Sequence, residues 1–109
     1  MVRQGFVLEE TVEKILQKLQ ANGAILRFVH HPRSSPEDRA GKDFTVVFSV
    51  DGKEVEHSFG VTISQQYLSE HKMMHPNVIH FCWPIGTNPS TMEKRILELS
   101  PKPATVGPP

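Results

Sequence analysis

Residues 43–59 read DFTVVFSVDGKEVEHSF, and this stretch decides the fold. Every second residue from Phe44 to Val50 is hydrophobic, which is typical of a half-buried strand. Asp51-Gly52 is the preferred dipeptide of a two-residue type I′ turn, and such a turn sets the register of a hairpin. The predicted cross-strand pairs are Val50–Lys53, Phe48–Val55, Val46–His57 and Phe44–Phe59. We therefore expect a hairpin with one hydrophobic, inward face and one mostly polar face.

The sequence before the hairpin predicts a helix, a strand and a loop. Residues Val12, Ile15, Leu16 and Leu19 form one hydrophobic stripe in a helix over about Glu9–Asn22. Ala24–His30 reads as a strand with hydrophobic residues on both faces, so we expect it to be covered on both sides. Residues 32–42 combine prolines with charged residues, which predicts a mobile surface loop.

A second helix and a fourth strand are predicted after the hairpin. Thr62 and Gln65 fit a capping box, and the helix ends before Pro76. The side chains expected to face the core from this segment are Ile63, Tyr67, Leu68 and Met74. Asn77–Trp83 is the most hydrophobic segment of the chain, so we expect a strand inside the sheet rather than at its edge.

A last helix is predicted from a second capping box at Ser90–Glu93 to about Leu99, with Met92, Ile96 and Leu99 facing inward. The element order α-β-β-β-α-β-α predicts an α+β fold, a two-layer sandwich with a four-stranded, mainly antiparallel sheet. We expect one domain over residues 1–99 and a proline-rich, disordered tail over residues 100–109.

Composition restricts the classes of function. The 109 residues include 12 Lys and Arg against 12 Asp and Glu, so no net field attracts nucleic acid or an anionic membrane. Cys82 is the single cysteine and cannot form an internal disulfide. Together with the lack of a signal peptide or a membrane-spanning run, this favours a cytoplasmic protein.

Histidines suggest one candidate metal site. His71 and His75 are four residues apart near a helix end, and His80 and Cys82 share one face of the predicted strand. Imidazole and thiolate are zinc ligands, so the turn between the pairs could bring together a zinc site. The competing interpretation, which we favour, is a half-buried histidine beside a buried free cysteine, with no cofactor.

His57 is predicted on the hydrophobic face of the hairpin, opposite Val46. A buried imidazole has to find a hydrogen-bond partner, and we expect a satisfied histidine at the end of the sheet. The functional alternative is a pocket residue or a pH-sensitive group.

The only locally basic segment is residues 27–42, whose candidate nucleic-acid contacts are Arg33, Arg39 and Lys42. A helix, three strands and a helix over residues 9–72 resemble the double-stranded RNA-binding domain in element order. That resemblance implies RNA binding through the start of the last helix of the domain. Here the matching stretch, residues 62–66, reads TISQQ and lacks the lysines that would bind phosphates.

No nucleophile elbow, phosphate-binding glycine loop or paired catalytic carboxylates occur in the sequence. We therefore expect a small non-catalytic binding or regulatory protein that acts through a protein–protein surface, with a protein partner or as a homodimer. The hairpin is the expected surface, in particular its second strand if that strand is an exposed edge of the sheet. One alternative is a nucleic-acid-binding module that uses residues 27–42. Another is a metal-binding protein or small metal-dependent enzyme that uses residues 71–82.

Overall fold

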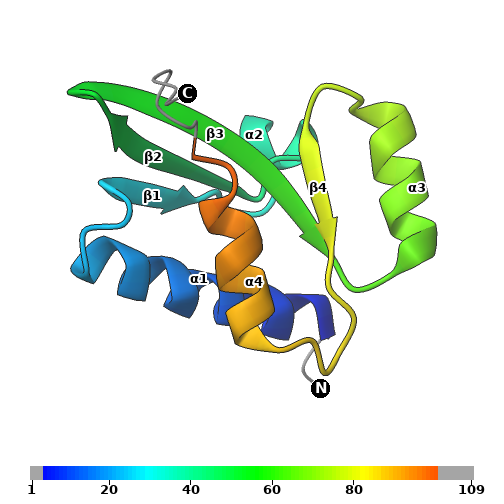
Figure 1. Ribbon diagram of the computed structural model, residues 1–109. Coiled ribbons are helices and arrows are strands. Elements are labelled where there is room, and N and C mark those ends of the chain that lie inside the picture. Colours follow the sequence, from blue (N-terminus) through cyan, green and yellow to red (C-terminus); the bar gives the residue numbers. More distant parts are fainter. Residues whose placement is uncertain (1–3, 101–109) are drawn as a thin grey trace, which may run out of the picture.

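The computed structural model describes residues 4–100 as an α+β fold with a four-stranded sheet (Figure 1). The elements in chain order are α1 (Gln4–Ala21), β1 (Arg27–His30), α2 (Pro36–Arg39), β2 (Phe44–Val50), β3 (Lys53–Thr62), α3 (Gln65–Met74), β4 (Ile79–Cys82) and α4 (Pro89–Leu97). The predicted fold class and element order are confirmed, with the short helix α2 added. Apart from Ser100, the tail predicted over residues 100–109 lies outside the described residues.

The strands follow one another across the sheet in the order β1-β2-β3-β4. The first three are antiparallel neighbours, and β4 pairs with β3 in parallel. The register of β2 with β3 is the predicted one in all four pairs. Asp51 and Gly52 have φ angles of 52° and 79°, which are the left-handed conformations that a type I′ turn requires.

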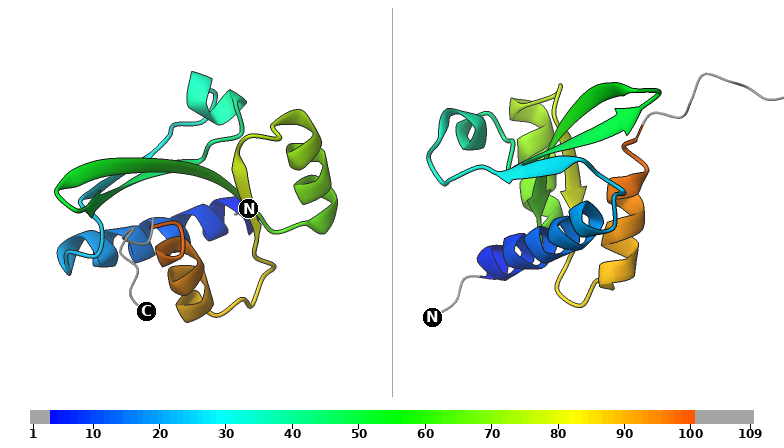
Figure 2. Two further views of the ribbon diagram at one scale, coloured as in Figure 1. Left: turned by 45° about the horizontal axis from the view of Figure 1, so that its top comes forward. Right: turned by 90° about the vertical axis from the view of Figure 1, so that its left-hand side faces the viewer.

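The core lies between one face of the sheet and the helices α1 and α4, which cover that face (Figure 2). The predicted helical stripe is buried against the inward residues of the hairpin, and Phe44 and Phe59 stack there with ring centroids 5.6 Å apart. The residues that are almost fully buried are Val12, Leu16, Leu19, Ile25, Phe44, Val46, Phe48, Phe59 and Ile96. Burial of each such side chain stabilises the fold by roughly 1.5–3 kcal/mol.

β4 is an edge strand, and the prediction that it lies inside the sheet is wrong. It pairs only with β3, over Phe59–Thr62. Phe81 and Trp83 are buried, with stacked rings 4.7 Å apart, whereas Ile79 is partly exposed. The hydrophobic run therefore reflects packing against the core and α3, and not a second neighbouring strand.

The helix α3 also differs from the prediction. Ser64 is its N-cap and accepts a hydrogen bond from the Tyr67 amide, because Thr62 is still the last residue of β3. Tyr67 and Met74 were expected in the core but are exposed, and no residue of α3 is buried. The reason is position: α3 lies beside β4 at the edge of the sheet and not over its covered face (Figure 1).

The first part of the chain departs from the prediction in three places. α1 begins at Gln4 rather than near Glu9, and β1 is shorter than the predicted strand. β1 is covered on one face only, since Val29 on its outer face is 49% exposed. The predicted loop over residues 32–42 contains α2, which Ser35 caps by accepting a hydrogen bond from the Asp38 amide.

The last helix is capped by Asn88 rather than by Ser90. The Asn88 side chain accepts from the Ser90 amide, and Pro89 occupies the first turn, where its missing N–H costs nothing. Met92 and Ile96 are buried as predicted, and Leu99 is partly buried beyond the end of the helix. No helix within residues 4–100 combines the length and hydrophobicity needed to cross a bilayer.

Candidate functional site

The outer edge of β1 is one of the free strand edges of the sheet. The His31 amide donates to the Asp43 carbonyl, so the backbone groups of His31 point toward β2. Because these groups alternate in direction along an antiparallel strand, those of His30 and Phe28 point away from β2. Within residues 4–100 no other strand pairs with this edge. Leu26 and Val29 beside it are 43% and 49% exposed.

His30 attaches this edge to α1. Its Nε2 and Nδ1 atoms each lie 2.9 Å from a carboxylate oxygen, of Glu9 and Glu13 respectively, and its ring stacks on Phe44. Burial lowers the pKa of His30, but the hydrogen bonds and charges of the two carboxylates outweigh it, so the pKa is raised above its ordinary value. A hollow of about 190 Å³ lies beside this cluster and is lined in part by Pro32 and Arg33.

The basic segment does not form a continuous cationic surface. Arg27 pairs with Glu54 at 2.6 Å across the outer face of the sheet. Arg33 and Arg39 are exposed, and Lys42 is half-buried. Between them, the Asp38 carboxylate accepts a hydrogen bond from the Ser34 amide, so acidic groups are part of the same loop.

The structure brings together the three histidines among the four candidate metal ligands. The ring centroids of His71 and His80 stack 5.5 Å apart, and those of His75 and His80 lie 6.4 Å apart. His80 Nε2 lies 3.3 Å from the His75 carbonyl oxygen. Burial, together with the neighbouring charges of His71 and His75, lowers the pKa of His80. Within residues 4–100 no group of three or more His, Cys, Asp or Glu side chains has the arrangement of a metal site.

Two glycines allow the histidine cluster to approach the sheet. A Cβ atom on Gly60 would lie 2.5 Å from the Gly41 carbonyl oxygen and 2.9 Å from His80 Nδ1. Gly41 has a φ of +85°, and a Cβ atom there would lie 2.7 Å from His75 Cδ2. These contacts exclude any larger residue at either position unless the loop or the histidines move.

Asp43 is a partly buried titratable group that is not among the candidates from the sequence. Burial, reinforced by the charges of Glu9 and Asp38, raises the pKa of Asp43 to about 7. The Val61 amide donates a 2.8 Å hydrogen bond to its carboxylate, which opposes that rise. Because the residue simply precedes a hydrophobic strand, no pattern in the sequence signals its burial.

His57 lies on the inward face opposite Val46, as the hairpin register predicts. Its Nε2 atom is buried and has no hydrogen-bond partner within the described part of the chain. The expectation of a satisfied histidine is therefore wrong. The ring instead meets the edge of Phe48, with centroids 6.3 Å apart.

The chain matches no protein-family model, no curated protein and no solved structure. What the protein does therefore has to follow from its own surfaces and side-chain contacts.

Proposed function

We propose that this protein is a non-catalytic binding module that acts through the outer edge of β1, in the simplest case by pairing with β1 of a second copy. The single observation that carries this proposal is the pair of outward backbone positions, Phe28 and His30, on a strand with hydrophobic exposed flanks. Such an edge is a template for another strand.

The other edges of the sheet are less suited to strand addition. α3 lies beside β4. The first part of β3 pairs only with β2, but its exposed side chains include Glu54 and Glu56, and charges of this kind oppose pairing. β1 carries neither proline nor lysine, and its one arginine, Arg27, is already paired.

A symmetric dimer follows from this geometry. Antiparallel pairing of β1 with its copy across a two-fold axis would join two sheets into one and bring each Val29 near the partner strand. Because β1 has only four residues, its backbone hydrogen bonds form a small interface. Burial of Leu26 and Val29 therefore has to contribute to the stability of the dimer.

The experiment measures molar mass by light scattering over a range of protein concentrations. We expect a concentration-dependent dimer that Val29→Lys converts to a monomer, because a lysine on an edge strand opposes pairing. Met73→Lys is the matched control, since Met73 is 83% exposed on α3. The proposal would be contradicted if the protein stayed monomeric at all concentrations and bound no partner through an added strand. A dimer that survives Val29→Lys would contradict it as well.

The two alternatives from the sequence stay predictions. Salt-dependent RNA binding that Arg33→Ala or Arg39→Ala weakens would support the nucleic-acid alternative. Stoichiometric zinc in elemental analysis, lost in His80→Ala, would support the metal alternative.

A further inference from the structure

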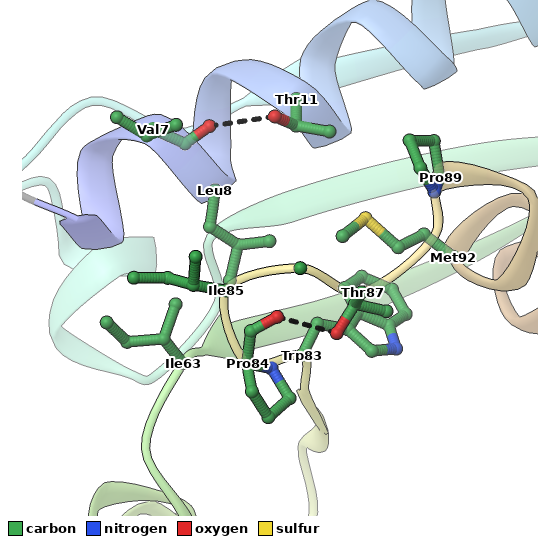
Figure 3. A pocket seen from close by; sticks show the side chains of 11 residues that line it. Val7, Leu8, Thr11, Ile63, Trp83, Pro84, Ile85, Thr87, Pro89 and Met92 are labelled. Carbon is green, nitrogen blue, oxygen red and sulfur yellow. Dashed lines mark hydrogen bonds between the residues drawn. The ribbon is translucent and has the colours of Figure 1, made fainter.

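A hydrophobic pocket of about 320 Å³ lies where the start of α1 meets the connection from β4 to α4 (Figure 3). Val7, Leu8 and Thr11 of α1 form one wall. The side chains that face them come from other parts of the chain: Ile63, Trp83, Ile85 and Met92. Trp83 and Met92 are buried, while Ile85 is 68% exposed at the rim.

The pocket offers hydrophobic surface, and both of its threonine hydroxyls already donate hydrogen bonds to backbone carbonyls. The Thr11 hydroxyl donates to the Val7 carbonyl at 3.0 Å, and the Thr87 hydroxyl donates to the Pro84 carbonyl at 2.6 Å. None of the residues that line it carries a charge. A ligand inside has to be uncharged there, because a buried charge without a partner is costly. The volume is roughly twice that of a cavity of about 150 Å³ that accepts benzene, which suits a body of about eight to ten carbons.

A second hollow of about 330 Å³ adjoins the first and shares Thr11 and Pro89 with it. Its charged lining residues are Lys14, Lys18 and Glu93. The residues of α1 that line the two hollows include positions 7, 11, 14 and 18, which lie on one face of a helix. At a rise of about 1.5 Å per residue, Lys14 is about 10 Å along the helix from Val7.

The charge at this end of the groove is positive. Lys18 is paired with Glu93 at 2.9 Å, whereas Lys14 forms no ion pair within residues 4–100. The start of α4, at Pro89 and Ser90, lines the same hollow and adds the partial positive charge of a helix N-terminus.

We infer that the two hollows form one site for a small amphipathic molecule, with a hydrophobic body in the pocket beside Trp83 and a single carboxylate-like group at Lys14. Hydrophobic enclosure at one end and an unpaired cation at the other select this chemistry over a neutral or a cationic ligand. The site is independent of the β1 edge, so either proposal can fail without the other.

Trp83 makes binding directly measurable, because it is the only tryptophan in the chain and is 5% exposed within the pocket wall. We would titrate the protein with octanoate and with octanol and follow Trp83 fluorescence. Both probes should give saturable changes, with octanoate binding roughly three- to fivefold more tightly, as expected for a solvent-accessible ion pair. Added salt should reduce that difference.

Three variants test the assignment. Lys14→Ala should weaken octanoate to the affinity of octanol and leave octanol unchanged, while Lys72→Ala, an exposed lysine on α3, should change neither. Ile85→Asp should weaken both probes, and its thermal unfolding should match that of the wild type because Ile85 is exposed. No saturable change with either probe would overturn the site. Equal affinity for octanoate and octanol, or an equal effect of Lys72→Ala, would overturn the role of Lys14.

Discussion

The helices α1 and α3 both flank the sheet, yet they bury very different amounts of hydrophobic surface. α1 lies across the covered face, and among the side chains described from residue 7 onward it buries five hydrophobic ones, namely Leu8, Val12, Ile15, Leu16 and Leu19. α3 lies beside the edge strand β4 and buries none, although it contains Tyr67, Met73 and Met74. The position of a helix relative to the sheet, more than its hydrophobic content, therefore determines how much it stabilises this fold.

The same contrast separates stability from mobility. α1 belongs to the hydrophobic core and also lines the proposed ligand site. α3 contributes few buried contacts, which is typical of segments that open locally at low free-energy cost. We therefore expect amide hydrogens of α3 to exchange with solvent before those of α1.

The largest difference between the two helices should appear when one leucine in each is replaced by alanine. Leu16→Ala should lower the free energy of unfolding by about 3–5 kcal/mol, because the side chain is fully buried and leaves a cavity. Leu68→Ala in α3, where the leucine is only partly buried, should cost less than half as much. Urea denaturation measures both, and equal losses would show that α3 is as much a part of the core as α1.

Asp43 lies where α1, α2 and the sheet meet, and its pKa of about 7 makes stability depend on pH. The folded state keeps the proton that the unfolded chain loses near its ordinary pKa of 3.8. Stability should therefore be greatest below about pH 4 and fall as the pH rises to about 7, with a plateau above. The loss attributable to Asp43 is about 4 kcal/mol, because each unit of pKa difference between the folded and unfolded states corresponds to about 1.4 kcal/mol.

Asp43→Asn should remove this slope and raise stability at pH 8, because the amide oxygen can still accept the Val61 hydrogen bond without a buried charge. Thermal denaturation from pH 4 to pH 8 measures the effect. Asp51→Asn, at the exposed turn, is the control and should leave the slope unchanged. A variant with the wild-type slope would mean that another group titrates.

Gly60→Ala tests how tightly the α3–β4 region joins the rest of the sheet. The new Cβ atom would meet the Gly41 carbonyl and His80, so the loop or the histidine cluster has to move, at a cost of about 1–3 kcal/mol. Gly52→Ala serves as a control for the steric contact. Its positive φ makes the substitution strained, but nothing lies near its Cβ position. Loss of the His71–His80 contact, seen as shifted histidine ring resonances, should accompany Gly60→Ala alone.

The smallest effect is expected at the exposed surface of α3. Met73→Ser should change the free energy of unfolding by less than about 0.5 kcal/mol, because the side chain is 83% exposed. Urea denaturation against wild type measures it. A loss above 1 kcal/mol, on the scale of a buried side chain, would indicate that another molecule or another part of the chain covers this surface.

The features that could be predicted from the sequence are those that depend on residues close together along the chain. The β2–β3 hairpin, its register and its inward face follow from the alternation around Asp51-Gly52, because turn geometry and side-chain direction are local properties. The buried stripe of α1 follows equally from its helical spacing. The candidate site agrees only in part with the sequence: the sequence predicts an exposed edge on the second strand of the hairpin, whereas the edge proposed from the structure is that of β1.

The features that required the tertiary structure are those that depend on how helices, strands and loops pack against one another. Hydrophobic residues in α3 and β4 have the same local pattern whether a sheet face or solvent lies opposite them, so the edge position of β4 could not be derived from its composition. Asp43 acquires its raised pKa mainly from burial, reinforced by the charges of Glu9 on α1 and Asp38 on α2. The groove beside Trp83 likewise exists because α1 and the connection after β4, which are far apart in the sequence, pack side by side. Burial, charge and cavities are products of packing, and one segment alone does not contain them.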